Sequence, residues 1–257
     1  FQFCKGKEFF SKEYWGYALR IGIPIVPHYL SGIILNQGDR IMIDKMVGKT
    51  EVALYGLAYS IGMLVQLFIS GMNSALTPWM YSKIKKGDIR SMRKVLQLLS
   101  IVVVGIAVAL MLISPELVLI FGSPKYREAV YVIPPVAASV FFIFIYNILS
   151  MPQFYYEKTQ FLMAASMAAA GANVVLNFIF IRLFGYIAAG YTTLACYMLY
   201  SVGHYIVSKR ILVNEGIQEN LMNPGFLVAC SVFLIGASII CNLIFPYRIL
   251  RYAILLA

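Results

Sequence analysis

The chain has 257 residues, of which 61% are hydrophobic and only 12% are charged, and its mean hydropathy is +0.79. Soluble globular domains are about one quarter charged. This composition therefore excludes a soluble domain and predicts an all-α, polytopic membrane protein. The net charge of +10 is explained by lysine and arginine in cytoplasmic loops, so no nucleic-acid partner is expected.

Residues 1–15 form a polar, basic segment that we expect to lie in the cytoplasm. The first predicted membrane span covers residues 16–37 and carries no charge except Arg20. This length is close to the roughly 20 residues that an α-helix needs to cross a bilayer. Pro24 and Pro27 lie inside the span, and membrane helices tolerate such prolines where neighbouring helices satisfy the freed carbonyls. We therefore expect this span to bend against protein.

The later apolar runs predict seven more spans. In chain order they cover 52–80, 95–113, 130–150, 161–184, 186–208 and 226–245, followed by the start of another at 249–257. The predicted domains are then a six-helix transmembrane lobe at 16–208, a cytoplasmic loop at 209–224, and additional helices at 225–257. The last of these helices is truncated, and we expect the chain to be a fragment of a longer protein.

The orientation in the membrane follows from lysine and arginine in alternate connections. One set of connections, which includes the N-terminal segment and the basic loop 81–94, holds 13 of them, and the other set holds 8. Cytoplasmic loops carry the excess of positive charge, so the first set is predicted to lie inside.

Polar side chains recur at helical spacing in three of the predicted spans. They are Tyr55, Tyr59, Gly62, Gln66, Ser70, Asn73 and Thr77 in the second; Ser166, Asn173 and Asn177 in the fifth; and Thr193, Tyr197, Ser201, His204 and Ser208 in the sixth. Each residue alone fits either a hydrogen bond between helices or a contact with substrate. Together the stripes predict a polar cavity. The third and seventh spans carry no stripe, and we expect them to face lipid.

The charged and titratable residues leave alternatives open. Asp39 and Arg40 form either a local ion pair that caps the first span or the charged rim of a cavity. His28 and His204 are either packed, hydrogen-bonded residues or members of a proton relay. Every carboxylate near a span falls at a span end in this prediction, so none is expected in mid-membrane. We find no catalytic motif and no metal-ligand spacing, and we expect neither an enzyme nor a cofactor.

Three segments carry a resemblance to a known family. Residues 47–62, which follow the Asp39–Arg40 pair, resemble the start of the C-terminal half of bacterial polysaccharide flippases of the Wzx type. Residues 121–139 and 172–193 are similar to two later segments of that family. The last segment departs from the family pattern at two positions, Arg182 and Ala189.

The resemblance implies a fold and a cargo. The superfamily also holds lipid II flippases and multidrug and toxin extrusion (MATE) transporters, so the chain would be the second six-helix lobe of a two-lobe transporter, with extra C-terminal helices. Its partners would be the missing N-terminal six-helix lobe, membrane lipids and the cargo, a lipid-linked oligosaccharide on undecaprenyl pyrophosphate. The protein would be a multi-pass protein of the bacterial cytoplasmic (inner) membrane that exports polysaccharide precursors by alternating access.

The resemblance also implies roles for residues. Arg40 would attract phosphate or an acidic sugar, with Asp39 positioning it, and sugar hydroxyls would bind to Gln66, Asn73, Asn177 and Tyr197. The alternatives are a multidrug or cation antiporter of the same superfamily, a polytopic polysaccharide polymerase or ligase, and a structural membrane subunit. The antiporter would require a buried acidic residue, which this chain is predicted to lack.

Overall fold

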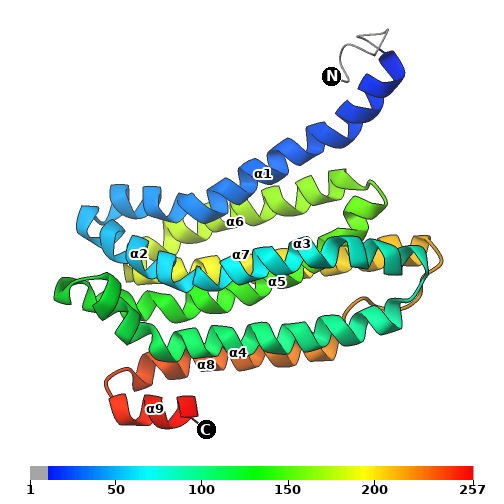
Figure 1. The fold of residues 1–257 in the computed structure, drawn as a ribbon. Helices are drawn as coiled ribbons and strands as arrows, with labels where there is room; N and C mark the ends of the chain where they lie inside the picture. Colours follow the sequence, from blue (N-terminus) through cyan, green and yellow to red (C-terminus); the bar gives the residue numbers. More distant parts are fainter. Residues whose placement is uncertain (1–10, 257) are drawn as a thin grey trace, which may run out of the picture.

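The computed structural model describes residues 11–256, which form a bundle of helices without a β-strand (Figure 1). The helices are α1 (Lys12–Met46), α2 (Lys49–Gly62), α3 (Leu64–Lys85), α4 (Ile89–Phe121), the 3-10 helix η1 (Pro124–Val132), α5 (Ile133–Tyr155), α6 (Thr159–Phe184), α7 (Ile187–Asn214), α8 (Pro224–Ile244) and α9 (Arg248–Leu256). The predicted all-α fold is confirmed. Of the predicted polar segment 1–15, residues 1–10 lie outside the described range and residues 12–15 belong to α1.

Six helical stretches within residues 11–256 are long and apolar enough to cross a membrane. They cover Lys12–Met46, Lys49–Lys85, Ile89–Phe121, Pro124–Tyr155, Thr159–Phe184 and Pro224–Ile244. The predicted span 186–208 is not among them, although it lies within the 28-residue helix α7. The polar side chains of α7 lower its hydropathy, and they are compatible with a bundle because α7 packs against α5 and α6.

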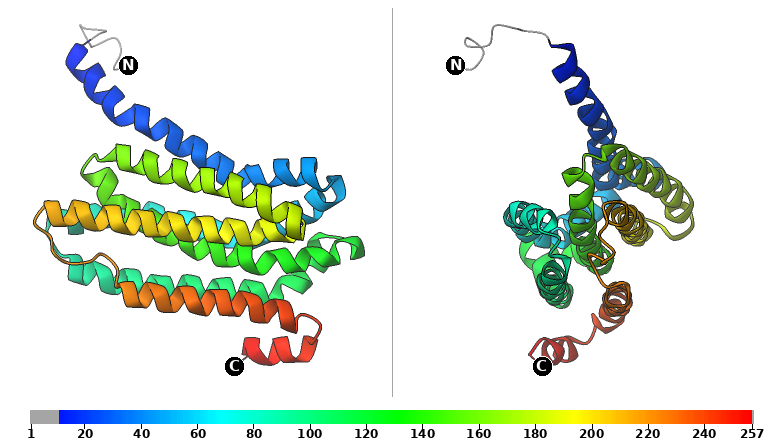
Figure 2. Two further views of the ribbon diagram at one scale, coloured as in Figure 1. Left: turned by 180° about the vertical axis from the view of Figure 1, so that it is seen from behind. Right: turned by 90° about the vertical axis from the view of Figure 1, so that its right-hand side faces the viewer.

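The core of the bundle is α5. In its most apolar stretch 89% of the residues are buried, compared with 11% in α1 and 22% in α8. The end-on view shows α5 at the centre, with the other long helices around it (Figure 2). The N-terminal part of α1 leans away from the bundle in all views. α5 is therefore the central helix, and most of the other long helices pack against it.

The helices extend further than the predicted spans. α1 continues to Met46, beyond the predicted end of the first span at residue 37. α4 runs through Pro115 to Phe121, where the sequence predicted a connection at 114–129. Apolar runs mark the part of a helix that fits the hydrocarbon layer, and the helix itself can extend beyond that part.

The second predicted span is interrupted at Met63, between α2 and α3. Gly62 approaches α5 so closely at this point that a Cβ atom would lie 2.7 Å from Cγ1 of Val136. The polar stripe predicted along the whole span is therefore divided between two helices, α2 and α3. This break decides which of its residues reach the cavity described below.

α4, which contains the third predicted span, buries one face in the bundle. This face includes Leu96, Ser100, Val103, Ala107 and Met111. The other face is exposed and apolar, with Leu98 and Ile101 more than half exposed, so contact with lipid stays a prediction for that face. The residues of the buried face are mostly apolar, so a search for polar stripes could not reveal it. α8, by contrast, buries only Leu234, Ser238 and Cys241.

All the connections predicted to be cytoplasmic lie at one end of the bundle, which is the right-hand end in Figure 1. This end holds the start of α1, the α3–α4 and α5–α6 turns, and the α7–α8 segment. In the α3–α4 turn, Asp88 accepts hydrogen bonds from Lys83 Nζ (2.5 Å) and from the backbone N–H of Ser91 (3.3 Å). The bond from Lys83 lowers the pKa of Asp88, so this carboxylate stays charged and caps α4.

Candidate functional site

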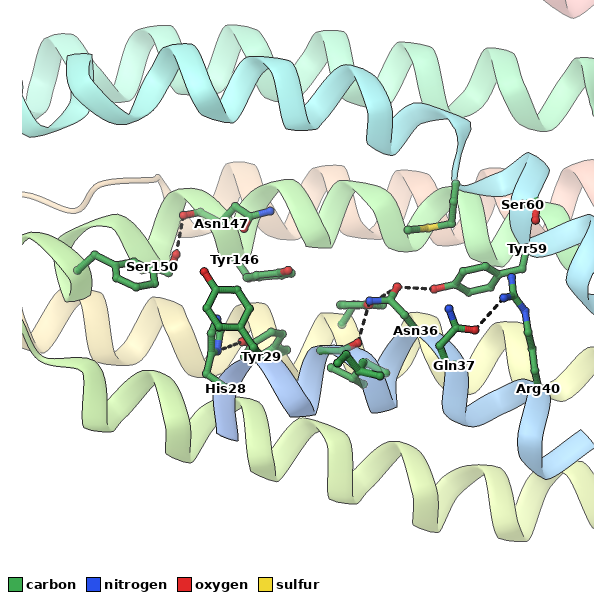
Figure 3. A pocket seen from close by; sticks show the side chains of 17 residues that line it. His28, Tyr29, Asn36, Gln37, Arg40, Tyr59, Ser60, Tyr146, Asn147 and Ser150 are labelled. Carbon is green, nitrogen blue, oxygen red and sulfur yellow. Dashed lines mark hydrogen bonds between the residues drawn. The ribbon is translucent and has the colours of Figure 1, made fainter. Parts of the chain in front are cut away.

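A polar cavity of about 740 Å³ is lined by α1, α2, α5 and α7, with Met63 at the α2–α3 break (Figure 3). Its polar lining residues are Asn36, Gln37, Arg40, Ser60, Asn147 and Ser150, and its aromatic ones are His28, Tyr29, Tyr59, Tyr146, Phe154, Tyr197 and Tyr200. The cavity follows α1 from His28 to Arg40, roughly 18 Å at about 1.5 Å per residue. It is of a size that proteins use for organic ligands.

Arg40 provides the charge of the cavity. Its Nη1 donates a hydrogen bond to Oε1 of Gln37 (2.8 Å), and its guanidinium carbon lies 5.1 Å from the centre of the Tyr59 ring. Its Nε–H is buried and has no acceptor. Within residues 11–256, no Asp or Glu side chain lines the cavity and Arg40 forms no ion pair. The positive charge is therefore available to an anion.

Asn36 connects three helices at the floor of the cavity. Its side-chain oxygen accepts hydrogen bonds from the hydroxyls of Tyr59 (2.8 Å) and Tyr197 (3.4 Å), and its amide donates to the carbonyl of Gly32 (2.8 Å). Tyr59 belongs to α2 and Tyr197 to α7, so these hydrogen bonds connect α1 to both helices. Their hydroxyl and amide groups form a hydrogen-bonding surface next to Arg40.

Aromatic rings fill the end of the cavity that is distant from Arg40. The ring of Tyr146 lies parallel to that of Tyr197, with centroids 6.2 Å apart, and 4.5 Å from the ring of Tyr200. The hydroxyl of Tyr200 is 3.1 Å from Nδ1 of His28, which lines the cavity. His204 lies behind this layer, completely buried. Both histidines are thus packed, and a role in proton transfer stays a prediction.

Asp39 does not line the cavity; its side chain is completely buried between α1, α2, α6 and α7. Its Oδ2 accepts hydrogen bonds from Tyr55 (2.5 Å) and Thr193 (2.6 Å), and its Oδ1 accepts one from Nδ2 of Asn177 (2.5 Å). Asn177 accepts in turn from the hydroxyl of Thr192. Four helices, α1, α2, α6 and α7, therefore meet at this carboxylate.

This arrangement corrects two expectations. Asp39 lies inside α1, away from its ends, so the chain does contain a buried carboxylate in a membrane-spanning helix. Asp39 and Arg40 form no ion pair with each other; consecutive helical residues point about 100° apart, and here one faces the buried cluster and the other the cavity. All three donors to Asp39 are neutral. A carboxylate with neutral donors alone has the chemistry to hold a proton or a small cation.

The structure divides the six predicted binding residues into three groups. Arg40 and Tyr197 line the cavity, whereas Asp39 and Asn177 belong to the buried cluster behind it. Gln66 and Asn73 lie on α3, beyond the break at Met63, and do not line the cavity. Each of these two has a buried side-chain oxygen without a hydrogen-bond donor.

Several residues that line the cavity were not predicted from the sequence. Asn36 lies four residues before Arg40 and thus on the same face of α1, a spacing that could have revealed it. Tyr146 and Asn147 lie in a predicted span with few polar residues, so no periodic signal marked them. They reach the cavity because α5 passes beneath it.

The fold and the cavity define a polytopic helical membrane protein with a polar, cationic binding cavity between its helices. Residues 24–179 match the MatE family, and the chain belongs to this family of membrane transporters. It is similar to the "Lsg locus putative protein 1" of Haemophilus influenzae, with 29% identity over 159 residues that cover 59% of this chain and 38% of that protein. It is also similar to an "Uncharacterized membrane protein" of Haemophilus influenzae, with 30% identity over 165 residues, 60% of this chain and 39% of the relative. The chain thus matches less than half the length of each relative, and no solved structure matches it significantly.

Proposed function

We propose that the chain is one half of a flippase that moves a lipid-linked oligosaccharide, carried on undecaprenyl pyrophosphate, across the bacterial cytoplasmic membrane. The observation that carries the proposal is the cavity, whose walls offer several hydroxyl and amide groups and, at one end, the cation of Arg40, which forms no ion pair within residues 11–256. A sugar head group presents many hydroxyls and few charges, and its phosphate or acidic sugar requires a cationic partner in a membrane.

The amides and hydroxyls of the cavity match neutral sugar groups. Both Asn147 and Gln37 line the cavity; the amide of Asn147 donates to the carbonyl of Ile143 (2.9 Å), and the side-chain oxygen of Gln37 accepts from Arg40. Each therefore retains hydrogen-bonding capacity for a ligand. Side chains that are already positioned by the helix lose little entropy when a ligand binds.

A second lobe would complete the site. The two relatives are more than twice as long as the part of them that this chain matches, so their remaining length has room for another helical lobe. In the proposed mechanism two lobes rock around the cavity and expose it alternately to each side. α1 would follow this motion by bending at Pro24 and Pro27, because its N-terminal part already leans away from α6 (Figures 1 and 2).

The proposal is tested in the native host by deleting the gene for the full-length protein and analysing lipid-linked oligosaccharides. We expect one complete repeat unit to accumulate on its lipid carrier at the cytoplasmic face, with loss of surface polysaccharide. Wild-type protein and Lys125→Ala should restore export, since Lys125 is exposed and lies outside the cavity. Arg40→Ala should restore little export even though the variant protein is present at normal abundance. Normal surface polysaccharide in the deletion strain would overturn the proposal.

The antiporter of the same superfamily gains support from Asp39, a buried carboxylate surrounded by neutral donors only. Such a group can exchange a proton against a cation during transport. The same deletion strain distinguishes the two functions: an antiporter predicts new sensitivity to cationic drugs with normal surface polysaccharide. Restoration of drug resistance by wild-type protein, and failure of Asp39→Asn to restore it, would then assign the coupling role to Asp39.

A further inference from the structure

A second, apolar groove of about 400 Å³ lies on the other side of the α5–α7 pair. α8 packs against α4 and α5, and the groove runs between α7 and α8 with α5 as its floor. Its lining includes Phe141 and Ile145 from α5, Met198 and Val202 from α7, and Val228 and Val232 from α8. Val202, Val228 and Val232 are more than half exposed, so the groove opens towards the surroundings of the protein.

The groove offers nothing to a polar ligand. Its two serines already use their hydroxyls within the protein: Ser201 donates to the carbonyl of Phe142 (2.8 Å), and Ser231 to that of Leu227 (2.7 Å). The rest of the lining is apolar apart from the hydroxyl of Tyr205. A hydrocarbon chain binds favourably here, because it makes van der Waals contacts with side chains that otherwise lack them.

The end of the groove that is predicted to be cytoplasmic carries positive charge. On α8 the groove extends from Pro224, the first residue of that helix, to Ile235, roughly 16 Å at about 1.5 Å per residue. On α7 it ends at Tyr205, and Lys209 lies one turn further towards the cytoplasm on the same face. Lys209 and Arg210 are exposed, and neither forms an ion pair with any residue of the described range. Charge and apolar groove together match a lipid with an anionic head group.

The groove is separate from the cavity of the proposed transport site. Neighbouring residues of the same helices face opposite ways: Tyr146 and Tyr197 line the cavity, whereas Ile145 and Met198 line the groove. A lipid in the groove therefore has its head group at Lys209 and cannot place it in the cavity across α5 and α7. This separation indicates a resident membrane lipid instead of the tail of transported cargo.

We propose that the α7–α8 groove binds an acyl chain of an anionic phospholipid from the cytoplasmic leaflet, with its phosphate on Lys209. The bound lipid takes the place of the direct packing that α7 and α8 do not make. It would thereby connect α8 to the rest of the bundle and make the attachment of α8 dependent on lipid composition. The proposal does not depend on which cargo the protein moves.

The test measures lipid retention by native mass spectrometry on the full-length protein, purified in mild detergent and titrated with dioleoyl phosphatidylglycerol or dioleoyl phosphatidylcholine. We expect wild-type protein to retain the anionic lipid preferentially. Val228→Trp should abolish retention by filling the groove, and Val202→Trp does the same from the opposite wall. Lys209→Ala should weaken binding of phosphatidylglycerol about fivefold while leaving that of phosphatidylcholine unchanged. Lys86→Ala, an exposed lysine at the same end of the bundle, is the matched control.

Each outcome decides for or against the proposal. Unfolding temperatures equal to that of wild type show that a tryptophan variant is folded, and the second tryptophan variant serves if the first is not. Equal retention of phosphatidylglycerol by wild type and a folded tryptophan variant would overturn the groove as the binding site. Equal loss of phosphatidylglycerol binding in Lys86→Ala and Lys209→Ala would overturn Lys209 as the phosphate site, because any exposed lysine at this end would then have the same effect. Retention of an isoprenoid diphosphate in place of phospholipid would overturn the assigned occupant.

Discussion

The hydroxyl oxygen of Tyr55 lies 2.5 Å from Oδ2 of Asp39, and both side chains are completely buried. This contact joins α1 to α2, and the same carboxylate joins α1 to α6 through Asn177 and to α7 through Thr193. Hydrogen bonds to a charged or low-dielectric site are among the stronger ones in proteins. The side chain of Asp39 thus connects α1 to three other helices, α2, α6 and α7.

Replacing Asp39 should therefore destabilise the bundle. Asp39→Ala leaves three buried donors without an acceptor, and each costs about 1–3 kcal/mol. Asp39→Asn keeps one acceptor oxygen and should cost less. We would measure thermal unfolding in detergent by intrinsic fluorescence. Asp44→Ala is the control, because Asp44 is exposed on the same helix. An unfolding temperature of Asp39→Ala equal to that of wild type would contradict this role of the carboxylate.

A new carboxylate beside Arg40 should impair export without removing the arginine. Gln37 accepts a hydrogen bond from Arg40 at 2.8 Å, so Gln37→Glu would place a negative charge at that distance and neutralise the cavity. We expect export of polysaccharide precursors to fall as it does in Arg40→Ala, at normal protein abundance. The matched control Gln160→Glu makes the same change at an exposed position outside the cavity. If Gln37→Glu exports normally, Arg40 does not act through its charge.

A single methyl group at Gly62 should disturb the contact between α2 and α5. The added Cβ would lie 2.7 Å from Cγ1 and 2.9 Å from Cβ of Val136, whose side chain is completely buried. Overpacking of this kind costs about 1–3 kcal/mol. Gly56→Ala is the matched control, because no atom lies within 4 Å of its added Cβ and alanine favours the helix. Comparison of the two unfolding temperatures checks the prediction, and a Gly62→Ala variant as stable as Gly56→Ala would refute it.

The C-terminal helix α9 is held to α4 by a buried arginine. Arg251 is 4% exposed, and its two terminal nitrogens each lie 2.9 Å from an oxygen of Glu116. Arg251→Ala should release α9, so that limited proteolysis cleaves near residue 247 faster than in wild type. Arg248→Ala, on the same helix but without an ion pair in the described part of the chain, is the control. Unchanged cleavage in Arg251→Ala would show that the remaining contacts, among them the hydrogen bond from the hydroxyl of Tyr252 to Glu116 (2.9 Å), are sufficient to hold α9.

The class of the protein could be predicted from the sequence because hydrocarbon selects for long apolar helices, and these are visible in any linear reading. The polar stripe of the sixth predicted span contained Tyr197, which lines the cavity, since polar residues within apolar helices rarely face lipid. Arg40 also lines the cavity, but its role was implied by the family resemblance, and its chemistry alone left an ion pair with Asp39 equally open. The sequence also predicted which connections share one end of the bundle, because successive spans alternate in direction. That this end is cytoplasmic stays a prediction from the excess of lysine and arginine.

The tertiary structure alone decided how neighbouring polar residues divide between the cavity and the packed interior. Asp39 and Arg40 are adjacent in sequence, yet one meets Asn177 and Thr193, more than 130 residues away, while the other faces the cavity. The break at Met63 likewise separates Tyr59, which reaches the cavity, from Gln66, which does not. Helical periodicity defines which residues share a face of one helix, but only packing against distant helices determines what that face contacts.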